Sequence, residues 1–111
     1  MRRVATVVLV LILSPIAEAQ AQEDDNRTVQ AVGVSYSSAS TPTSAAYFSV
    51  VEGLSLSCLS GVIYVDLTVD FGRGALAQLL SAKSTGQMLT RIVYSQDSST
   101  NLCWLSMAQI G

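Results

Sequence analysis

The apolar residues of this chain recur mainly at every second position, which is the period of a β-strand. Val32, Val34 and Tyr36 show this alternation, and the run VIYVDLTV at 62–69 is rich in the β-branched and aromatic residues that favour strands. Strands are therefore expected at 28–36, 47–51, 54–58, 62–69, 88–94 and 102–110. The third continues the hairpin that the second begins. Between the first two strands, small and turn-forming residues at 37–44 predict a loop.

The period changes to that of an α-helix between residues 72 and 84. Alanine and leucine at positions 75, 76, 79 and 80 fall along one stripe, as on a helix that packs against a sheet. Asp70 fits the N-cap of this helix, and Gly86 fits the residue just after its C-terminus. The pattern predicts a mainly β protein with one helix, in the order β-β-β-α-β-β.

The first residues have the layout of a secretory signal peptide. Arg2 and Arg3 precede an apolar run at 4–13, and Ser14-Pro15 ends that run before small-residue cleavage sites. A run of this length spans about half the hydrocarbon core of a bilayer, so it predicts a removed signal rather than a membrane anchor. A buried core helix, the alternative, would need a polar face. We expect a signal peptide at 1–19 (cleavage after residue 19 or 21), a flexible N-terminus at 20–27 and a single domain at 28–111.

The composition of the chain excludes several kinds of catalytic and metal site. The chain has 111 residues, no histidine and two cysteines. It therefore lacks a histidine-activated nucleophile and imidazole ligands, and two cysteines cannot complete a four-thiolate zinc site. We expect a protein that is not an enzyme and needs neither metal nor cofactor. Without the signal, the chain carries seven acidic and four basic residues, a net charge of −3, which disfavours nucleic acid and anionic lipid as partners.

Export also bears on the two cysteines. In the periplasm or outside the cell an even pair is most simply a disulfide, and Cys58 with Cys103 is the single intramolecular choice. Such a bridge closes a loop of about 45 residues, which the chain-entropy model values at about 4 kcal/mol. The alternative is two buried free thiols.

Two patterns around the helix imitate catalytic motifs. Gly72-x-Gly74-x-x-Ala77 follows a strand and opens a helix, as in a dinucleotide-binding site, but the chain is too short for that fold. Small residues that let the helix begin close to the sheet are the simpler interpretation. Asp66 and Asp70 could pair for acid–base chemistry. A solvent-facing strand residue and a helix cap are simpler roles for them.

The helical segment and its flanking strands also carry a family resemblance. In VIYVDLTVDFGRGALAQLLSAKSTGQMLTRIVYSQ a strand leads into a helix of the type A-x-x-x-L-L-x-A-x-x-x-G-[QK], and a strand follows directly. Tyr47-Phe48 and a cysteine after a short polar turn add to the pattern. With these features, 58–111 resembles the B subunits of bacterial AB5 toxins, especially the pertussis-like and subtilase-cytotoxin types and their small secreted relatives. The chain departs from them in having fewer cysteines and a shorter segment before Cys103.

The resemblance implies a small OB-fold-like β-barrel with one helix, assembled as a homo-pentameric ring, that binds cell-surface glycans beside a toxin A subunit. The predicted order, with one helix between the third and fourth strands, agrees with an OB-fold. Family sugar sites use serine and aromatic residues of the early strands, so Ser35, Tyr36 and Tyr47 are the ligand-binding candidates. Ordinary strand and loop roles are the alternative for all three.

Two functions of different classes follow. The first is a secreted, non-catalytic, ring-forming module that binds glycans. The second is an envelope protein of the periplasm that uses the same fold for contacts with other proteins and has no toxin partner.

Overall fold

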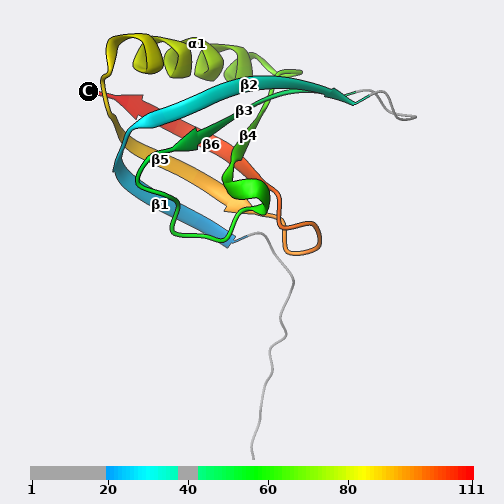
Figure 1. The fold of residues 1–111 in the computed structure, drawn as a ribbon. Coiled ribbons are helices and arrows are strands. Elements are labelled where there is room, and N and C mark those ends of the chain that lie inside the picture. The colour runs from blue at the N-terminus through cyan, green and yellow to red at the C-terminus, as the bar shows by residue number, and fades with distance from the viewer. Residues whose placement is uncertain (1–19, 38–42) are drawn as a thin grey trace, which may run out of the picture.

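The computed structural model describes residues 20–37 and 43–111. The predicted signal peptide and the middle of the predicted loop at 37–44 lie outside these residues. The elements are β1 (Gln20–Arg27), β2 (Val29–Ser37), β3 (Thr43–Val50), the short 3₁₀ helix η1 (Leu59–Gly61), β4 (Ile63–Asp66), α1 (Asp70–Thr85), β5 (Leu89–Gln96) and β6 (Cys103–Ile110) (Figure 1). The prediction of a mainly β protein with one helix is confirmed.

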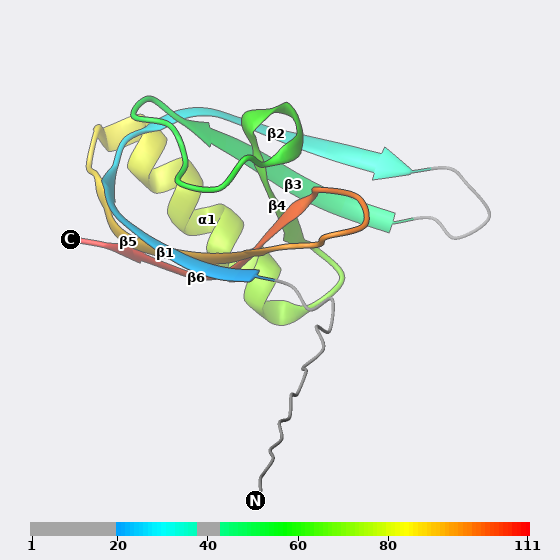
Figure 2. The ribbon, with the colours of Figure 1, turned by 90° about the horizontal axis from the view of Figure 1, so that it is seen from below.

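The strands form one curved sheet in the order β1-β5-β6-β4-β3-β2. Neighbouring strands are antiparallel except β4 and β6, which are parallel. The sheet is not closed, because its two edge strands, β1 and β2, do not pair with each other. Figure 2 shows β1, β5 and β6 along one side, β2 and β3 across the other, and α1 behind them.

A single residue, Thr28, joins the two edge strands. Its backbone N–H and its hydroxyl each donate to the Glu52 carboxylate at 2.7 Å, and its carbonyl accepts from the Val51 N–H at 2.9 Å. The hydrogen bond from the Thr28 backbone, the largest influence, lowers the pKa of Glu52. The loop after β3 thus holds the bend that carries the chain from one edge of the sheet to the other.

The segment 20–27 corrects one expectation from the sequence. It was expected to be flexible, yet it forms β1, paired with β5 from Gln20↔Gln96 to Arg27↔Leu89. Its polar composition predicts fraying, but ladder hydrogen bonds do not depend on side-chain type, and its Asp24 is buried. A polar strand at a sheet edge therefore lacks the hydrophobic alternation that reveals other strands.

Further boundaries differ from the predicted pattern: β3 begins at Thr43 instead of residue 47, and β4 ends at Asp66 instead of residue 69. Residues 54–58 form no strand, because they cross from β3 to η1 as a loop whose Ser55 bonds to the Asp24 side chain. The helix begins one residue earlier than expected: Val69 is its N-cap, and no side chain caps it. Its predicted end is confirmed, since Gly86 has φ 76° and donates its N–H to the Ala82 carbonyl.

The core lies between the concave face of the sheet and α1. The largest fully buried side chains come from α1, β3, β4, β5 and β6: Tyr94, Phe48, Ile63, Leu79, Leu89, Ile92, Val65 and Cys103. The helix contributes Gly72, Ala75, Leu79 and Ala82, whereas Leu80 of the predicted stripe is 50 % exposed. A helix this close to the sheet needs small residues where it crosses the strands.

Two interpretations of the sequence are confirmed by this packing. A β-carbon at Gly72 would collide with the Asp66 carbonyl oxygen, so this glycine serves the close approach of α1 to β4. Cys58 and Cys103 form the predicted disulfide, with their Cα atoms 5.5 Å apart. The bridge attaches the start of η1 to β6.

Candidate functional site

Three aromatic side chains lie side by side on the convex face of the sheet. Tyr47 of β3 is paired with Tyr64 of β4, and Tyr64 is paired with Trp104 of β6. The ring centroids of Tyr47 and Tyr64 are 5.9 Å apart, and those of Tyr64 and Trp104 are 5.6 Å apart. Along each strand, the residues directly before and after these three are buried in the core. Because successive side chains of a strand point to opposite faces, the three rings point away from the core. We call Tyr47, Tyr64 and Trp104 the aromatic row.

Small residues continue this line to both edges of the sheet. Tyr47 is paired with Gly33 of β2, Trp104 with Ser95 of β5, and Ser95 with Ala21 of β1. A β-carbon at Gly33 would collide with the Tyr47 ring, so that ring lies over the bare Gly33 backbone. The rings are therefore not screened by long side chains from their neighbours in the same line.

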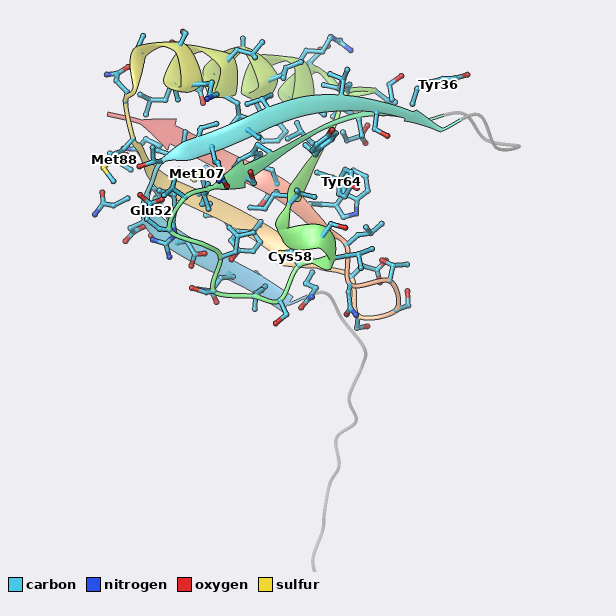
Figure 3. All side chains as sticks on the ribbon, viewed as in Figure 1. Tyr36, Glu52, Cys58, Tyr64, Met88 and Met107 are labelled. Atoms are coloured by element: carbon cyan, nitrogen blue, oxygen red, sulfur yellow. A yellow bond between two sulfur atoms is a disulfide. The ribbon has the colours of Figure 1, made fainter. Side chains whose placement is uncertain are left out.

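The aromatic row combines apolar ring faces with polar groups at the ring edges. All three residues are partly exposed. Within residues 20–37 and 43–111, no protein group bonds to the Tyr64 hydroxyl or to the Trp104 indole N–H. Figure 3 shows Tyr64 beside β4, below the hairpin of β2 and β3. Flat ring faces next to free hydrogen-bond donors can bind a ligand that has both apolar faces and hydroxyl groups.

The three ligand-binding candidates from the sequence have different positions. Tyr47 belongs to the aromatic row. Ser35 is exposed on β2, two residues from Gly33 and therefore on the same face of the strand as the row. Tyr36 is 65 % exposed and points to the opposite face, near the end of the hairpin (Figure 3). The structure thus brings Ser35 towards Tyr47 and separates Tyr36 from both.

Sequence reasoning missed Tyr64 and Trp104. A usable signal existed for each, because neighbouring strand residues point to opposite faces. Once Cys103 is assigned to a disulfide in the core, Trp104 must point outwards. In the run VIYVDLTV, Ile63 and Val65 are the better core residues, which places Tyr64 outside. What the sequence could not supply is the register that aligns the three strands.

Apart from the aromatic row, a cluster of polar side chains surrounds Asp24, whose own side chain is buried. Its carboxylate accepts from the Tyr94 hydroxyl at 2.7 Å, the Ser55 N–H at 2.9 Å and the Ser55 hydroxyl at 2.5 Å. Burial alone would raise the pKa of Asp24, but these bonds and one from Gln22 outweigh it and lower that pKa. Burial and the bond to Asp24 raise the pKa of Tyr94 to about 12. The cluster holds the loop before η1 against β1 and β5.

The two acidic side chains near the helix have different partners. Asp66 accepts from the N–H and hydroxyl of Thr68, and Asp70 forms an ion pair with Arg73.

In the described part of the chain, no group of three or more histidine, cysteine or acidic residues could hold a metal ion. Among the same residues, no helix has the length and apolar character needed to cross a membrane.

The fold and this surface together define a class: a mainly β protein with one helix, one disulfide and a row of aromatic side chains on the convex face of its sheet. No protein-family model, curated protein or solved structure matches the chain.

Proposed function

We propose that this protein is an exported, non-catalytic module that binds glycans through the aromatic row. The observation that carries the proposal is the side-by-side arrangement of Tyr47, Tyr64 and Trp104 on an accessible sheet face. Aromatic faces pack against the C–H faces of sugar rings, and the Tyr64 hydroxyl and Trp104 indole N–H, which bond to no other group among the described residues, suit sugar hydroxyls. The disulfide supports an oxidising compartment, which would be the periplasm or the exterior.

The strand order supports an OB-type arrangement. If β1 and β2 count as one strand bent at Thr28, the chain has five strands, with the helix between the third and the fourth. OB-folds are partly open five-stranded barrels that bind oligosaccharides or oligonucleotides on the face of their second and third strands. In this count β3 and β4 are those strands, and they carry Tyr47 and Tyr64.

The charge of the molecule favours a glycan over a nucleic acid. Residues 20–111 carry a net charge of −3. OB-folds that bind single strands add a cationic groove to their stacking residues, because the phosphate backbone supplies much of the affinity. The aromatic row without such a groove suits a ligand that stacks but has no phosphate.

We also propose that the protein self-associates through the free edge of β2, as the resemblance to ring-forming B subunits implies. No charged residue occurs in β2, whereas β1 carries Glu23, Asp24, Asp25 and Arg27. Charged side chains protect an edge strand from pairing with another chain, and β2 lacks that protection. Its exposed Val34 (68 %) and Tyr36 add apolar surface beside the edge.

The single tryptophan gives a direct test of glycan binding. Because Trp104 is the one tryptophan in the chain and belongs to the row, its fluorescence should change when a glycan binds. Ligands would first be found on a glycan array and then titrated against the purified protein. Loss of one stacking ring costs about 1.4 kcal/mol, so Tyr64→Ala should weaken binding about tenfold.

Phe71→Ala is the matched control, since it removes an exposed aromatic ring on α1, outside both the row and the β2 edge, and should leave the affinity unchanged. Equal loss in both variants would contradict a site at the row. A single stoichiometric protein partner, recovered by co-purification together with an absence of glycan signal, would support the envelope-protein alternative.

A further inference from the structure

We infer that the aromatic row accepts uncharged glycans and discriminates against glycans that carry carboxylate or sulfate groups. This inference rests on the proposed function and specifies its ligand class. It follows from where the charged side chains lie relative to Tyr47, Tyr64 and Trp104.

The basic side chains of the described residues are placed elsewhere. Two are arginines at the far end of the sheet from the row: Arg91 pairs with Glu23 at 3.1 Å, and Arg27 lies beside Asp24 at 3.7 Å. Arg91 is four residues along β5 from Ser95, which is about 13 Å of strand. Both arginines are thus distant from the row and already next to a carboxylate.

The remaining cations belong to α1. Arg73 pairs with Asp70 in the first turn and donates to the Leu67 carbonyl, and Lys83 lies in the last turn. The helix packs on the concave side of the sheet, whereas the row lies on the convex side. In sequence, the loop at 38–42 is SASTP and adds no charge. Acidic ligand groups are usually recognised by arginine, lysine or a helix N-terminus, and the row has none of these beside it among the described residues.

An acidic side chain stands next to the row instead. Asp66 follows Tyr64 by two residues in β4, so both point to the same face about 7 Å apart along the strand. The Thr68 hydroxyl and N–H both donate to its Oδ1. These bonds, that from the hydroxyl first, lower the pKa of Asp66, so the carboxylate is ionised at neutral pH. The nearest cation, Arg73, bonds to the Leu67 carbonyl beside Asp66 but is already paired with Asp70, so an acidic sugar on the row would face a net negative charge.

The test compares neutral oligosaccharides with acidic counterparts by titration of Trp104 fluorescence. The neutral probes are lactose, maltotriose and chitotriose, and the acidic probes are sialyllactose, lactose sulfate and trigalacturonate. We expect at least one neutral probe to bind at least about threefold more tightly than any acidic probe. Its affinity should change less than twofold between low and high salt, because no charge on the ligand is screened.

Two variants test the electrostatic cause. Coulomb's law at about 7 Å in a water-like dielectric corresponds to about a threefold change in affinity, so Asp66→Asn should lower the ratio of neutral to acidic affinity about threefold. Ser95→Arg places a cation beside Trp104 and should raise the affinity for the acidic probes further. Thermal melting of each variant checks that the fold is retained.

The outcomes separate this inference from the proposed function. Acidic probes that bind as well as or better than neutral ones, with binding lost in Tyr64→Ala, would overturn the inference and leave glycan binding intact. If no neutral or acidic probe binds, on the array or in solution, both are overturned. Tight neutral binding that Asp66→Asn and Ser95→Arg leave equally selective would also overturn the electrostatic explanation.

Discussion

The Asp24 carboxylate is 3 % exposed and joins three segments that are distant in the sequence. It belongs to β1, and its hydrogen bonds come from Ser55 in the loop before η1 and from Tyr94 in β5. A buried carboxylate is costly unless such donors satisfy it. Here the donors are one backbone N–H, two hydroxyls and the Gln22 side-chain amide, so the charge is stabilised and β1 is held in place.

Replacing Asp24 should therefore destabilise the protein strongly. Asp24→Asn removes the charge that these donors stabilise, and the free energy of unfolding in urea should fall by about 2 to 3 kcal/mol. Asp25→Asn is the matched control, because Asp25 is exposed on the same strand and its change should stay within about 0.5 kcal/mol.

The stability that Asp24 contributes should also depend on pH. Because the folded-state pKa of Asp24 lies below its usual value of 3.8, its contribution is complete above the usual pKa. The contribution disappears as the pH falls through the lowered pKa. The difference in unfolding free energy between wild type and Asp24→Asn should therefore shrink only below about pH 4. Equal stability of wild type and variant at pH 7 would contradict the role given to this carboxylate.

At the scale of elements, the position of α1 depends on how closely its first turn approaches β4. Gly72 faces the Asp66 carbonyl oxygen, where a β-carbon would collide with backbone, whereas Gly74, two residues later, has open space around it. Both glycines are helical. The two glycines of the apparent nucleotide-binding pattern therefore differ. Gly72 is required for close packing of α1 on β4, whereas a side chain would fit at Gly74.

These two glycines form a matched pair for measurement. Gly72→Ala should lower the free energy of unfolding by about 1 to 3 kcal/mol, because the helix must move away from β4. Gly74→Ala should raise it by about 0.5 to 1 kcal/mol, because alanine favours the helix and meets nothing. Urea denaturation of both variants measures the difference, and equal effects of the same sign would show that α1 does not approach β4 as described.

At the scale of the whole molecule, two covalent connections hold parts of the sheet together. Thr28 joins the two free edges, and the Cys58–Cys103 disulfide attaches the loop before β4 to β6. Among residues 20–37 and 43–111, the outer edge of β2 has no partner strand, and it is the edge without charged residues. Assembly of several copies would give this edge a partner.

A lysine on β2 should prevent that assembly. In Val34→Lys the added charge disfavours pairing of the β2 edge with another copy. Light scattering coupled to size-exclusion chromatography should show a mass of about five chains for the wild type, as the resemblance implies, and one chain for the variant. Leu80→Lys, which changes a half-exposed apolar residue on α1, should leave the oligomer intact. A monomeric wild type would refute self-association.

Some elements of this molecule could be predicted from the sequence and others could not, for physical reasons. Strands such as 28–36 and the helix were predicted because one face of each is buried, and burial imposes a period on the sequence. The strand at 20–27 was missed because the residue that it buries, Asp24, is charged. A hydropathy pattern assigns such a residue to the surface. The segment 54–58 alternates leucine with serine like a strand, yet its backbone serves the Asp24 carboxylate instead of a neighbouring strand.

The sequence by itself determined the mainly β character, the single helix with its C-terminal glycine, and the one intramolecular pairing open to the two cysteines, because these depend on local periodicity, backbone conformation and counting. Only the tertiary structure decided that Tyr47, Tyr64 and Trp104 lie in one line, that Tyr36 lies away from them, and that Asp24 is buried. Those facts depend on strand register and on contacts between distant segments. A one-residue shift in register would turn each ring to the other face, and nothing local in the sequence specifies that register.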